Sequence, residues 1–369
     1  MPHDPYQALY IHIPFCVSRC LYCDFTTEAL DADAPRISDY VDDLCLKIRR
    51  LSKEGEFGAL STIYIGGGTP THIGLGRLTQ LLYTLSLSIN LEQIAEFTVE
   101  ANPESLTESL VKDSFALGVN RLSIGVQSFD DAVLSLLGRA HDAERARAAI
   151  ELAQTRFTNV SVDLMCGIPG QSDASFADSL KSAIDAGVTH VSIYPLTIEE
   201  GTPLAKAVRR RRFPNIDEDD QARQMELAAR VLGEAGFSRY EVANYALPGY
   251  ESRHNSAYWS GVPYLGLGRS AATMTQNATR RMRKVDDLIT DDLGPQQMLA
   301  EDLMLAMRMT RGVEVWRVEA ACAVLPRATE CFEELVTLGL AKRVDGRYVP
   351  TERGWLCGNE LYGRIFDLA

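Results

Sequence analysis

Short apolar runs alternate with stretches of helical periodicity through the first two thirds of the chain. A strand is predicted where β-branched and aromatic residues gather over four to six positions, and a helix where apolar residues recur every three to four. The predicted strands cover residues 9–13, 62–65, 97–100, 121–126, 160–164 and 190–194. The predicted helices cover residues 38–53, 75–87, 107–117, 130–155 and 173–186, with Ser38 as the cap of the first. Six strand–helix units in series indicate a parallel sheet.

Chemically unusual residues follow the ends of these strands. They include a cysteine cluster, a run of three glycines, Glu100, Gln127 and Asp163. Barrel-type α/β enzymes place their chemistry at the carboxyl ends of the strands. We therefore predict an α/β fold with a partial (β/α)6 barrel. An open doubly wound sheet is the alternative, because periodicity alone does not separate the two.

The strand–helix rhythm ends near residue 237. Residues 238–292 are predicted to form a loop-rich extension, since residues 240–275 are dense in Tyr, Gly and Asn. In residues 293–369, helical patterns lead to Asp345-Gly346, a turn that predicts a hairpin. Helices followed by a hairpin indicate a winged-helix-like α+β module, for which we expect a structural role because no basic cluster is present. The expected units are residues 1–237, 238–292 and 293–369.

Composition narrows the class of protein. The chain has 369 residues, 46% of them hydrophobic, and a formal net charge of -13, which disfavours nucleic acid and anionic membrane as main partners. No apolar run is long enough for a membrane span, and no basic segment leads into an apolar core near the N-terminus, so we expect no secretory signal. Three of the eight cysteines are clustered and five are scattered, which is unlike a disulfide framework. A cytoplasmic location is expected.

The cluster Cys16-x3-Cys20-x2-Cys23 offers three thiolates within eight residues. A [4Fe–4S] cluster has four irons, so three cysteines would leave one iron open for a substrate or cofactor. The alternative is a zinc site with His12 as the fourth ligand. Zinc motifs usually consist of two separated ligand pairs, which favours the iron–sulfur cluster here.

The segment from His12-Ile13-Pro14-Phe15-Cys16 to Phe25 resembles the signature of one branch of the radical S-adenosylmethionine (SAM) proteins. That branch contains the oxygen-independent coproporphyrinogen III oxidases and the HemW haem chaperones. The resemblance implies that SAM binds the open iron through its amino and carboxylate groups. It also implies reductive cleavage of SAM to methionine and a 5′-deoxyadenosyl radical, with an electron donor such as a flavodoxin or ferredoxin.

The resemblance extends to segments that contact SAM in this family. Gly66-Gly67-Gly68-Thr69-Pro70 resembles the loop that meets the SAM amino group, although by itself it is equally a tight turn. Glu100, Gln127, Arg139 and Asp163 are expected at or just past strand ends, where carboxylates suit ribose hydroxyls and Arg and Gln suit other polar atoms. The residues assigned to SAM are Tyr10, Tyr22, Gly67, Gly68, Thr69, Glu100, Gln127, Arg139 and Asp163.

Three features favour the chaperone branch over the oxidases. Phe25 stands where the oxidases carry a fourth cysteine, and the first cysteine at position 16 leaves no room for their N-terminal extension. His254-Asn255-x-x-Tyr258-Trp259 resembles the chaperone motif and assigns these four residues to haem, although a hydrogen-bonded loop histidine is an equal alternative for His254. Ala272 stands where the chaperones tend to have His, which weakens the match.

The expected function is therefore that of a haem chaperone, which binds haem and passes it to a haem-dependent acceptor protein. The alternatives are coproporphyrinogen III oxidase and another radical SAM enzyme such as a methylase. Other candidates for the axial haem ligand are Cys166, His141 and His190. Residues 209–212, four arginines, could pair with haem propionates or with a membrane reached through the acceptor. Because residues 217–220 are all acidic, a self-compensating solvated surface is the favoured interpretation.

Overall fold

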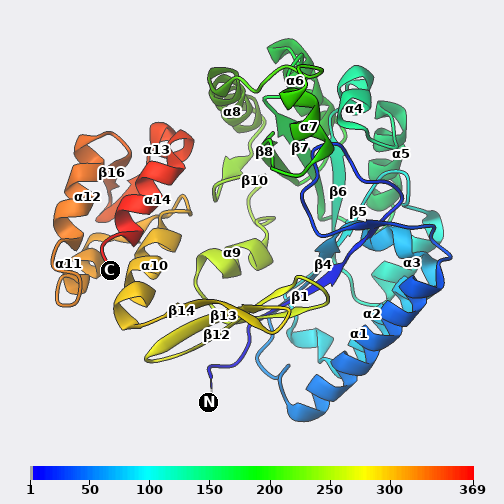
Figure 1. Ribbon diagram of the computed structural model, residues 1–369, viewed down its shortest axis with the longest axis horizontal. Coiled ribbons are helices and arrows are strands. Elements are labelled where there is room, and N and C mark those ends of the chain that lie inside the picture. The colour runs from blue at the N-terminus through cyan, green and yellow to red at the C-terminus, as the bar shows by residue number, and fades with distance from the viewer. Residues whose placement is uncertain (1–2) are drawn as a thin grey trace.

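The computed structural model describes residues 3–369, and a twelve-stranded mixed sheet organises it (Figure 1). Six neighbouring strands in the middle of this sheet run parallel. They are β1 (Ala8–Ile13), β4 (Thr62–Gly67), β5 (Glu96–Ala101), β6 (Arg121–Gln127), β7 (Val160–Cys166) and β8 (His190–Pro195). The six do not close on themselves, because β1 next pairs with β11 (Tyr264–Leu267) and β8 with β10 (Asn244–Ala246). The prediction of a partial barrel is confirmed.

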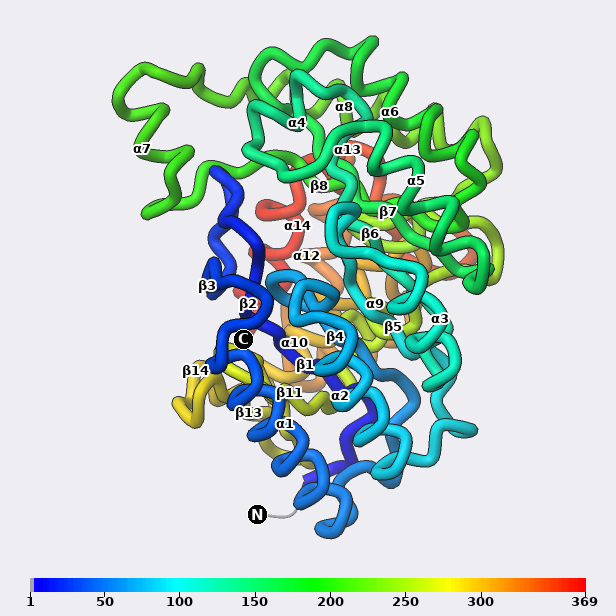
Figure 2. The backbone as a smooth tube through the Cα atoms, turned by 90° about the vertical axis from the view of Figure 1, so that its right-hand side faces the viewer, coloured from blue at the N-terminus to red at the C-terminus, as the bar shows by residue number. Residues whose placement is uncertain are grey.

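Helices cover the outer face of the curved parallel strands (Figures 1 and 2). They are α1 (Pro35–Glu54), α2 (Leu75–Ser88), α3 (Glu108–Ala116), α4 (Asp131–Leu137), α5 (Ala143–Gln154), α6 (Asp173–Asp185) and α8 (Glu218–Glu234). Smaller elements between them are β2 (Phe15–Cys16), β3 (Glu28–Ala29), η1 (Pro70–Ile73), η2 (Leu91–Gln93), α7 (Pro203–Arg209) and β9 (Ser238–Arg239). One hydrophobic core lies between these helices and the outward side chains of the strands.

The side chains on the inner face of the barrel are mostly polar. Successive residues of a strand point to opposite faces, so each strand combines an apolar outer row with an inner row of different chemistry. On β5, for example, Phe97 and Val99 join the apolar core. The inner polar positions on β5 to β8 are Glu96, Thr98, Glu100, Arg121, Ser123, Ser161, Asp163, His190 and Ser192. The barrel interior is therefore a hydrogen-bonding environment along its whole depth.

Helix α1 begins three residues before the predicted cap. Its first residue is Pro35, preceded by Ala34, and no side chain caps the amino end. Proline suits this position because its fixed φ matches the helix and the amide it lacks would have no partner there. The hydroxyl of Ser38 instead accepts a hydrogen bond from Arg77 at 2.7 Å. The prediction that Ser38 caps the helix is wrong.

The helical stretch predicted over residues 130–155 is two helices, α4 and α5. Gly138 ends α4 in the left-handed conformation, with φ of 72°. Asp142 begins α5 by accepting a hydrogen bond from the Arg145 amide at 2.8 Å. The break between the helices places Arg139 and His141 on a loop above β6.

Residues 238–292 contain more regular structure than the expected loop-rich extension. They form α9 (Arg253–Trp259) and the strands β11, β12 (Ala272–Asn277), β13 (Arg280–Val285) and β14 (Leu288–Leu293). Strands β13 and β14 carry exposed charges that pair across the hairpin, such as Arg280 with Asp292 at 2.5 Å. Their turn, Asp286-Asp287, has positive φ at both residues. Strands of this kind have no apolar alternation, which is why the sequence pattern does not show them.

The C-terminal module has a hydrophobic cluster of its own. Its elements are α10 (Pro295–Ala306), β15 (Val313–Glu314), α11 (Val315–Ala321), α12 (Ala328–Thr337), β16 (Ala341–Val344), β17 (Arg347–Pro350), α13 (Glu352–Leu356) and α14 (Gly358–Phe366). Asp345 and Gly346, both with positive φ, join β16 to β17, so the predicted hairpin is confirmed. The division into three units stays a prediction. Among residues 3–369, no helix is long and apolar enough to cross a membrane.

Candidate functional site

A cavity of about 350 Å³ opens at the carboxyl ends of the parallel strands. It collects side chains that are far apart in the sequence, because the ends of β4 to β8 meet there. The predicted residues that line it are Cys16, Cys20, Tyr22, Cys23, Gly67, Gly68, Thr69, Glu100, Gln127, Arg139 and Asp163. Tyr10 lies deeper on β1 and does not line the cavity, and its hydroxyl is bonded to His12 Nδ1 at 3.0 Å.

The three clustered cysteines lie at the rim of this cavity on the segment that follows β1. All eight cysteines of the chain are free thiols. Burial raises the pKa of Cys16 to about 11 and also raises that of Cys23. Gly68 allows the strand end to approach this segment, since a Cβ there would lie 2.8 Å from Cys16 Sγ. Thiols in this state need a cation to become thiolates, which is what bound iron supplies.

His12, the fourth ligand of the zinc alternative, is held by other groups of the protein. Zinc holds thiolates at about 2.3 Å, so its sulfur ligands must converge on one point. In the part of the chain that the structure describes, no three His, Cys, Asp or Glu side chains converge in this way. His12 is also engaged, through Nδ1 with Tyr10 and through Nε2 with the Thr26 carbonyl at 3.3 Å. An iron–sulfur cluster attaches each thiolate to a separate iron, so it does not require the sulfurs to converge on one point.

Glu100 is one of the two carboxyl groups that line the cavity from the inner face of the strands. Its Oε1 accepts a hydrogen bond from the Tyr64 hydroxyl at 2.7 Å, and its Oε2 accepts one from the Gly67 amide at 3.0 Å. Burial raises the pKa of Glu100 to about 7, with the charge of Asp163 adding to the shift. Burial also raises the pKa of Asp163. Two half-buried carboxyl groups that line the same cavity are a suitable receptor for a cationic ligand with hydroxyl groups.

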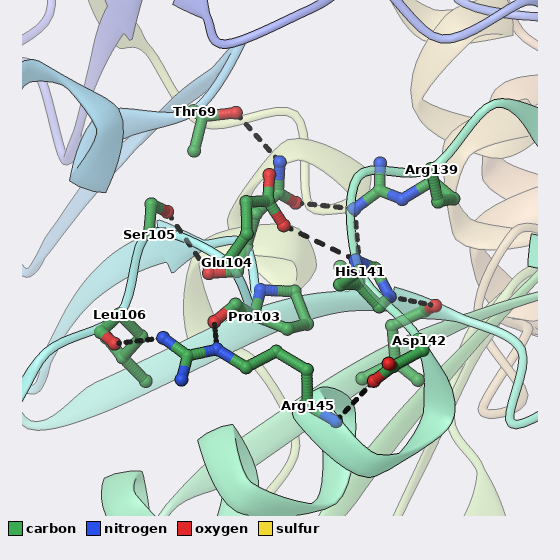
Figure 3. Close-up of polar contacts among 12 residues, drawn as sticks. Thr69, Pro103, Glu104, Ser105, Leu106, Arg139, His141, Asp142 and Arg145 are labelled. Atoms are coloured by element: carbon green, nitrogen blue, oxygen red, sulfur yellow. Dashed lines mark hydrogen bonds and ion pairs between the residues drawn. The ribbon is translucent and has the colours of Figure 1, made fainter.

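Arg139 reaches the cysteines from the loop between α4 and α5, so the expectation that it lies at a strand end is wrong. Its Nη1 donates to Cys20 Sγ at 3.3 Å, and its Nη2 donates to the Gly125 carbonyl at 2.7 Å. Nη2 also donates to Asn102 Oδ1 at 2.8 Å (Figure 3). Gln127, the last residue of β6, has φ of 66° at an irregularity in the pairing with β7. Positive φ is uncommon for a residue other than glycine, and such backbone concentrates at functional sites.

Asn102 also lines the cavity, although sequence reasoning did not select it. Its Nδ2 donates to the Thr69 hydroxyl at 2.9 Å. It belongs to the run Glu100-Ala-Asn-Pro, in which the carboxylate of Glu100 is the more distinctive group. An amide carries no charge and binds no iron, so nothing in the sequence distinguishes it from a turn residue.

The four residues assigned to haem lie elsewhere, on α9 near the amino ends of β4 and β5. His254 is only 1% exposed, its Nδ1 is bonded to Thr62 Oγ1 at 2.9 Å, and its ring stacks on Tyr64 at 5.0 Å. Burial lowers the pKa of His254 to about 3. The backbone amide of Asn255 donates to Ser252 Oγ, and the ring of Tyr258 packs edge-on against that of His254. Trp259 Nε1 donates to the Glu241 carboxylate at 2.8 Å. Protein groups surround these side chains, although His254 Nε2 is buried without a hydrogen-bond partner among the described residues. The assignment of the four residues to haem stays a prediction.

The other candidates for the axial ligand are also covered by protein. Cys166, His141 and His190 are buried, and burial raises the pKa of Cys166 to about 12. His141 is bonded to Glu104 at 3.3 Å and to the Val126 carbonyl at 3.1 Å (Figure 3). His190 is bonded to Ser161 at 2.7 Å and to Tyr240 at 2.9 Å. Hydrogen bonds within the protein therefore engage both nitrogens of the His141 and His190 rings.

The four arginines at residues 209–212 are exposed at the end of α7 and directly after it, on a segment that projects from the body of the molecule (Figure 2). Arg209 pairs with Glu200 at 2.6 Å. In the following acidic run, Asp217 accepts backbone hydrogen bonds at the start of α8, and Asp220 pairs with Arg223 at 2.6 Å. Among the described residues, the basic and acidic runs form no ion pair with each other, so direct pairing does not compensate their charges.

A parallel (β/α)6 barrel with three spaced cysteines at the mouth of a polar cavity defines a radical SAM protein. The model of the Radical SAM superfamily matches residues 10–183. The fold is shared with coproporphyrinogen III oxidase (HemN) from Escherichia coli, at a TM-score of 0.79 and 20% identity over 100% of this chain and 90% of that one.

Sequence comparison defines the family within this class. The chain is 36% identical to a "Heme chaperone HemW" of Mycobacterium tuberculosis, over 98% of this chain and 95% of that protein. It is 38% identical to a protein of the same name from Escherichia coli K12, over 72% of this chain and 70% of that protein. The chain belongs to the HemW family. Membership of the radical SAM class implies a [4Fe–4S] cluster and SAM as its cofactors.

We expect binding of SAM to weaken as the pH falls through about 7. The pKa of Glu100 is raised, so a falling pH protonates its carboxyl group and removes the charge that would attract the sulfonium and amino groups of SAM. Tyr64, Asp163 and Arg121 are the other titratable groups that act on Glu100. Isothermal titration of SAM into the reconstituted protein at several pH values between about 6 and 8 measures the effect.

The variant Glu100→Gln isolates this contribution. It should bind SAM more weakly and lose the pH dependence in this range, because glutamine does not titrate. Glu199→Gln is the matched control, since Glu199 is exposed at the rim of the same cavity. An affinity of the unmodified protein that stays constant over the whole range would contradict the prediction.

Proposed function

We propose that this protein is a haem chaperone, which binds haem and transfers it to a haem-dependent acceptor protein. The observation that carries the proposal is identity of 36% over 98% of the chain with a protein named "Heme chaperone HemW". The residue at position 25 supports it, because Phe25 offers no thiol where the oxidases have their fourth cysteine. Phe25 is 60% exposed at the mouth of the cavity.

Cys16, Cys20 and Cys23 are proposed to hold the cluster, with SAM beside it in the cavity. When bound, the cluster supplies one electron to the sulfonium of SAM. Glu100 and Asp163 would orient the bound SAM through its amino and hydroxyl groups. The surrounding strands and the Tyr64 hydroxyl would keep these carboxyl groups away from bulk water. An electron donor such as a flavodoxin or ferredoxin would reduce the cluster, which requires a reducing compartment such as the cytoplasm.

The partner of this chaperone is proposed to be a protein that uses haem, and membrane contact would occur through that acceptor. The exposed arginines of residues 209–212 are available for such a contact, since only Arg209 has an ion-pair partner among the described residues. Their positive charge contrasts with the net charge of -13 of the chain. An acidic partner surface or anionic headgroups would be attracted there rather than elsewhere.

The protein is expected to bind one haem per chain and to leave coproporphyrinogen III unchanged. Haem binding is measured by absorbance titration of the purified, anaerobically reconstituted protein. Conversion of coproporphyrinogen III is measured by release of carbon dioxide in the presence of SAM and dithionite. Sustained release of carbon dioxide that depends on SAM would contradict the chaperone proposal and support the oxidase. Failure to bind haem would contradict it as well.

The same titration tests whether His254 is an axial ligand. The variant His254→Ala should shift the haem absorption bands if its imidazole binds iron. His72→Ala serves as the control, because His72 is bonded to the Leu30 carbonyl far from α9. Unchanged haem absorption bands would mean that His254 has only a packing role and that another residue is the axial ligand.

A further inference from the structure

A continuous path of hydrogen bonds joins two of the cluster cysteines through three side chains. Thr69 Oγ1 donates to Cys16 Sγ at 3.6 Å, and Asn102 Nδ2 donates to Thr69 Oγ1 at 2.9 Å. At the other end, Arg139 Nη2 donates to Asn102 Oδ1 at 2.8 Å and Arg139 Nη1 donates to Cys20 Sγ at 3.3 Å. Figure 3 shows the part of this path between Thr69 and Arg139. The amide of Asn102 therefore uses both its donor and its acceptor to connect the two ends.

The strand ends around this path leave room for it. Thr69 follows β4, Asn102 follows β5, and Arg139 lies on the loop above β6. Gly125 on β6 is central, because a Cβ there would lie 2.8 Å from Asn102 Oδ1 and 3.5 Å from Arg139 Nη2. Its carbonyl also accepts from Arg139 at 2.7 Å. A side chain at position 125 would displace the amide of Asn102, so the absence of one keeps the path open.

The path brings one polar donor to each of two sulfurs. A hydroxyl reaches Cys16 and a positively charged guanidinium reaches Cys20. Hydrogen bonds to ligand sulfurs and nearby positive charge stabilise the more negative, reduced form of an iron–sulfur cluster and so raise its reduction potential. Asn102 touches neither sulfur, yet it is bonded to both donors. It donates to the Thr69 hydroxyl, and it accepts from the Arg139 guanidinium, which the Gly125 carbonyl also holds.

We propose that Asn102 is a positioning residue that orients Thr69 and Arg139 as donors to the cluster sulfurs and thereby raises the reduction potential of the cluster. The step concerned is the transfer of one electron from an external one-electron donor to the cluster, with no bond formed or broken. The proposal rests on the cluster assigned to Cys16, Cys20 and Cys23, and it is independent of haem transfer.

The test is a redox titration of the full-length, anaerobically reconstituted protein, followed by electron paramagnetic resonance of the reduced cluster, without SAM or haem. At the midpoint potential of the unmodified protein, Asn102→Ala should show a ratio of reduced to oxidised cluster that is about tenfold lower, since tenfold corresponds to about 59 mV for one electron. Asn120→Ala is the matched control, because the Asn120 amide bonds the backbone of Phe97 and Ala95 at the other end of β5.

A second pair of variants separates donation from a structural role. Thr69→Val keeps the shape of the side chain and removes the hydroxyl, so it should lower the potential, whereas Thr69→Ser keeps the hydroxyl and should restore it. Iron per chain is measured for every variant. If Asn102→Ala fails to hold iron, the reduction potentials of Thr69→Val and Thr69→Ser test the proposal in its place. Equal potentials for Thr69→Val and Thr69→Ser, or an unchanged potential in iron-loaded Asn102→Ala, would overturn the proposal, while haem binding could persist in either case.

Discussion

Replacing Cys16, Cys20 and Cys23 together by alanine is expected to abolish the iron–sulfur cluster. These are the three thiols at the rim of the cavity, and a [4Fe–4S] cluster depends on cysteine thiolates for its attachment. Anaerobic reconstitution of the unmodified chain should give about four irons per chain and the broad visible absorbance of such a cluster. In the triple variant, iron analysis and absorbance should both return to the background of protein treated without iron.

The scattered cysteines provide the control for this experiment. Cys322 and Cys357 belong to the C-terminal module, away from the cavity, and Cys357 is exposed. The double variant Cys322→Ala and Cys357→Ala should therefore keep its full iron content. A triple variant that still holds about four irons would show that other residues bind the cluster.

Truncating Glu96 is expected to cost about 3–5 kcal/mol in the free energy of unfolding, the range for leaving a buried charge uncompensated. Its carboxylate accepts hydrogen bonds from Ser252 Oγ at 2.9 Å and from the amides of Arg253 at 2.6 Å and His254 at 3.3 Å. It is also the main negative charge acting on Arg121, which is only 1% exposed. In Glu96→Ala, the start of α9 loses its acceptor, and the buried guanidinium of Arg121 loses the main negative charge that acts on it.

Equilibrium unfolding in urea, followed by circular dichroism, measures this effect. Glu92→Ala is the matched control, because Glu92 lies four residues earlier in an exposed position on η2 and should change the stability by less than about 0.5 kcal/mol. A cost for Glu96→Ala below about 1 kcal/mol would mean that Arg121 and α9 find other partners.

The strands of the barrel could be predicted because their outer residues are apolar. All six appear within two residues of the predicted ends, since the outer row has to fill the core beneath the helices. Strands were not predicted where they are held by charged pairs instead of apolar contacts. Strand β14 is exposed except for Leu293, and its neighbour β13 pairs through arginines, so neither has a hydrophobic alternation to detect.

The site was predictable in proportion to how distinctive each side chain is. The spacing of the cysteines and the carboxyl groups Glu100 and Asp163 stand out in the sequence, and the fold brings them to one cavity. The position of Arg139 was harder to predict, because it depends on the break between α4 and α5. Gly138 is the only residue in the sequence that indicates this break. The burial of His254 could not be foreseen, because it depends on pairing with Thr62, a contact between residues 192 positions apart.

The pairing of β1 with β11 has a consequence for how the chain is made on the ribosome. β1 is the first strand to be synthesised, yet one of its edges pairs with β11, where Ala8 lies opposite Tyr264 and Ile11 opposite Leu267. At about 5–20 residues per second, the other five parallel strands all emerge before that partner does. During this interval the edge of β1 in the nascent chain is unpaired, and its apolar residues are exposed. An exposed apolar strand edge can pair with other chains and cause aggregation. Completion of the barrel, and protection of this edge, therefore wait for a segment synthesised after all six parallel strands.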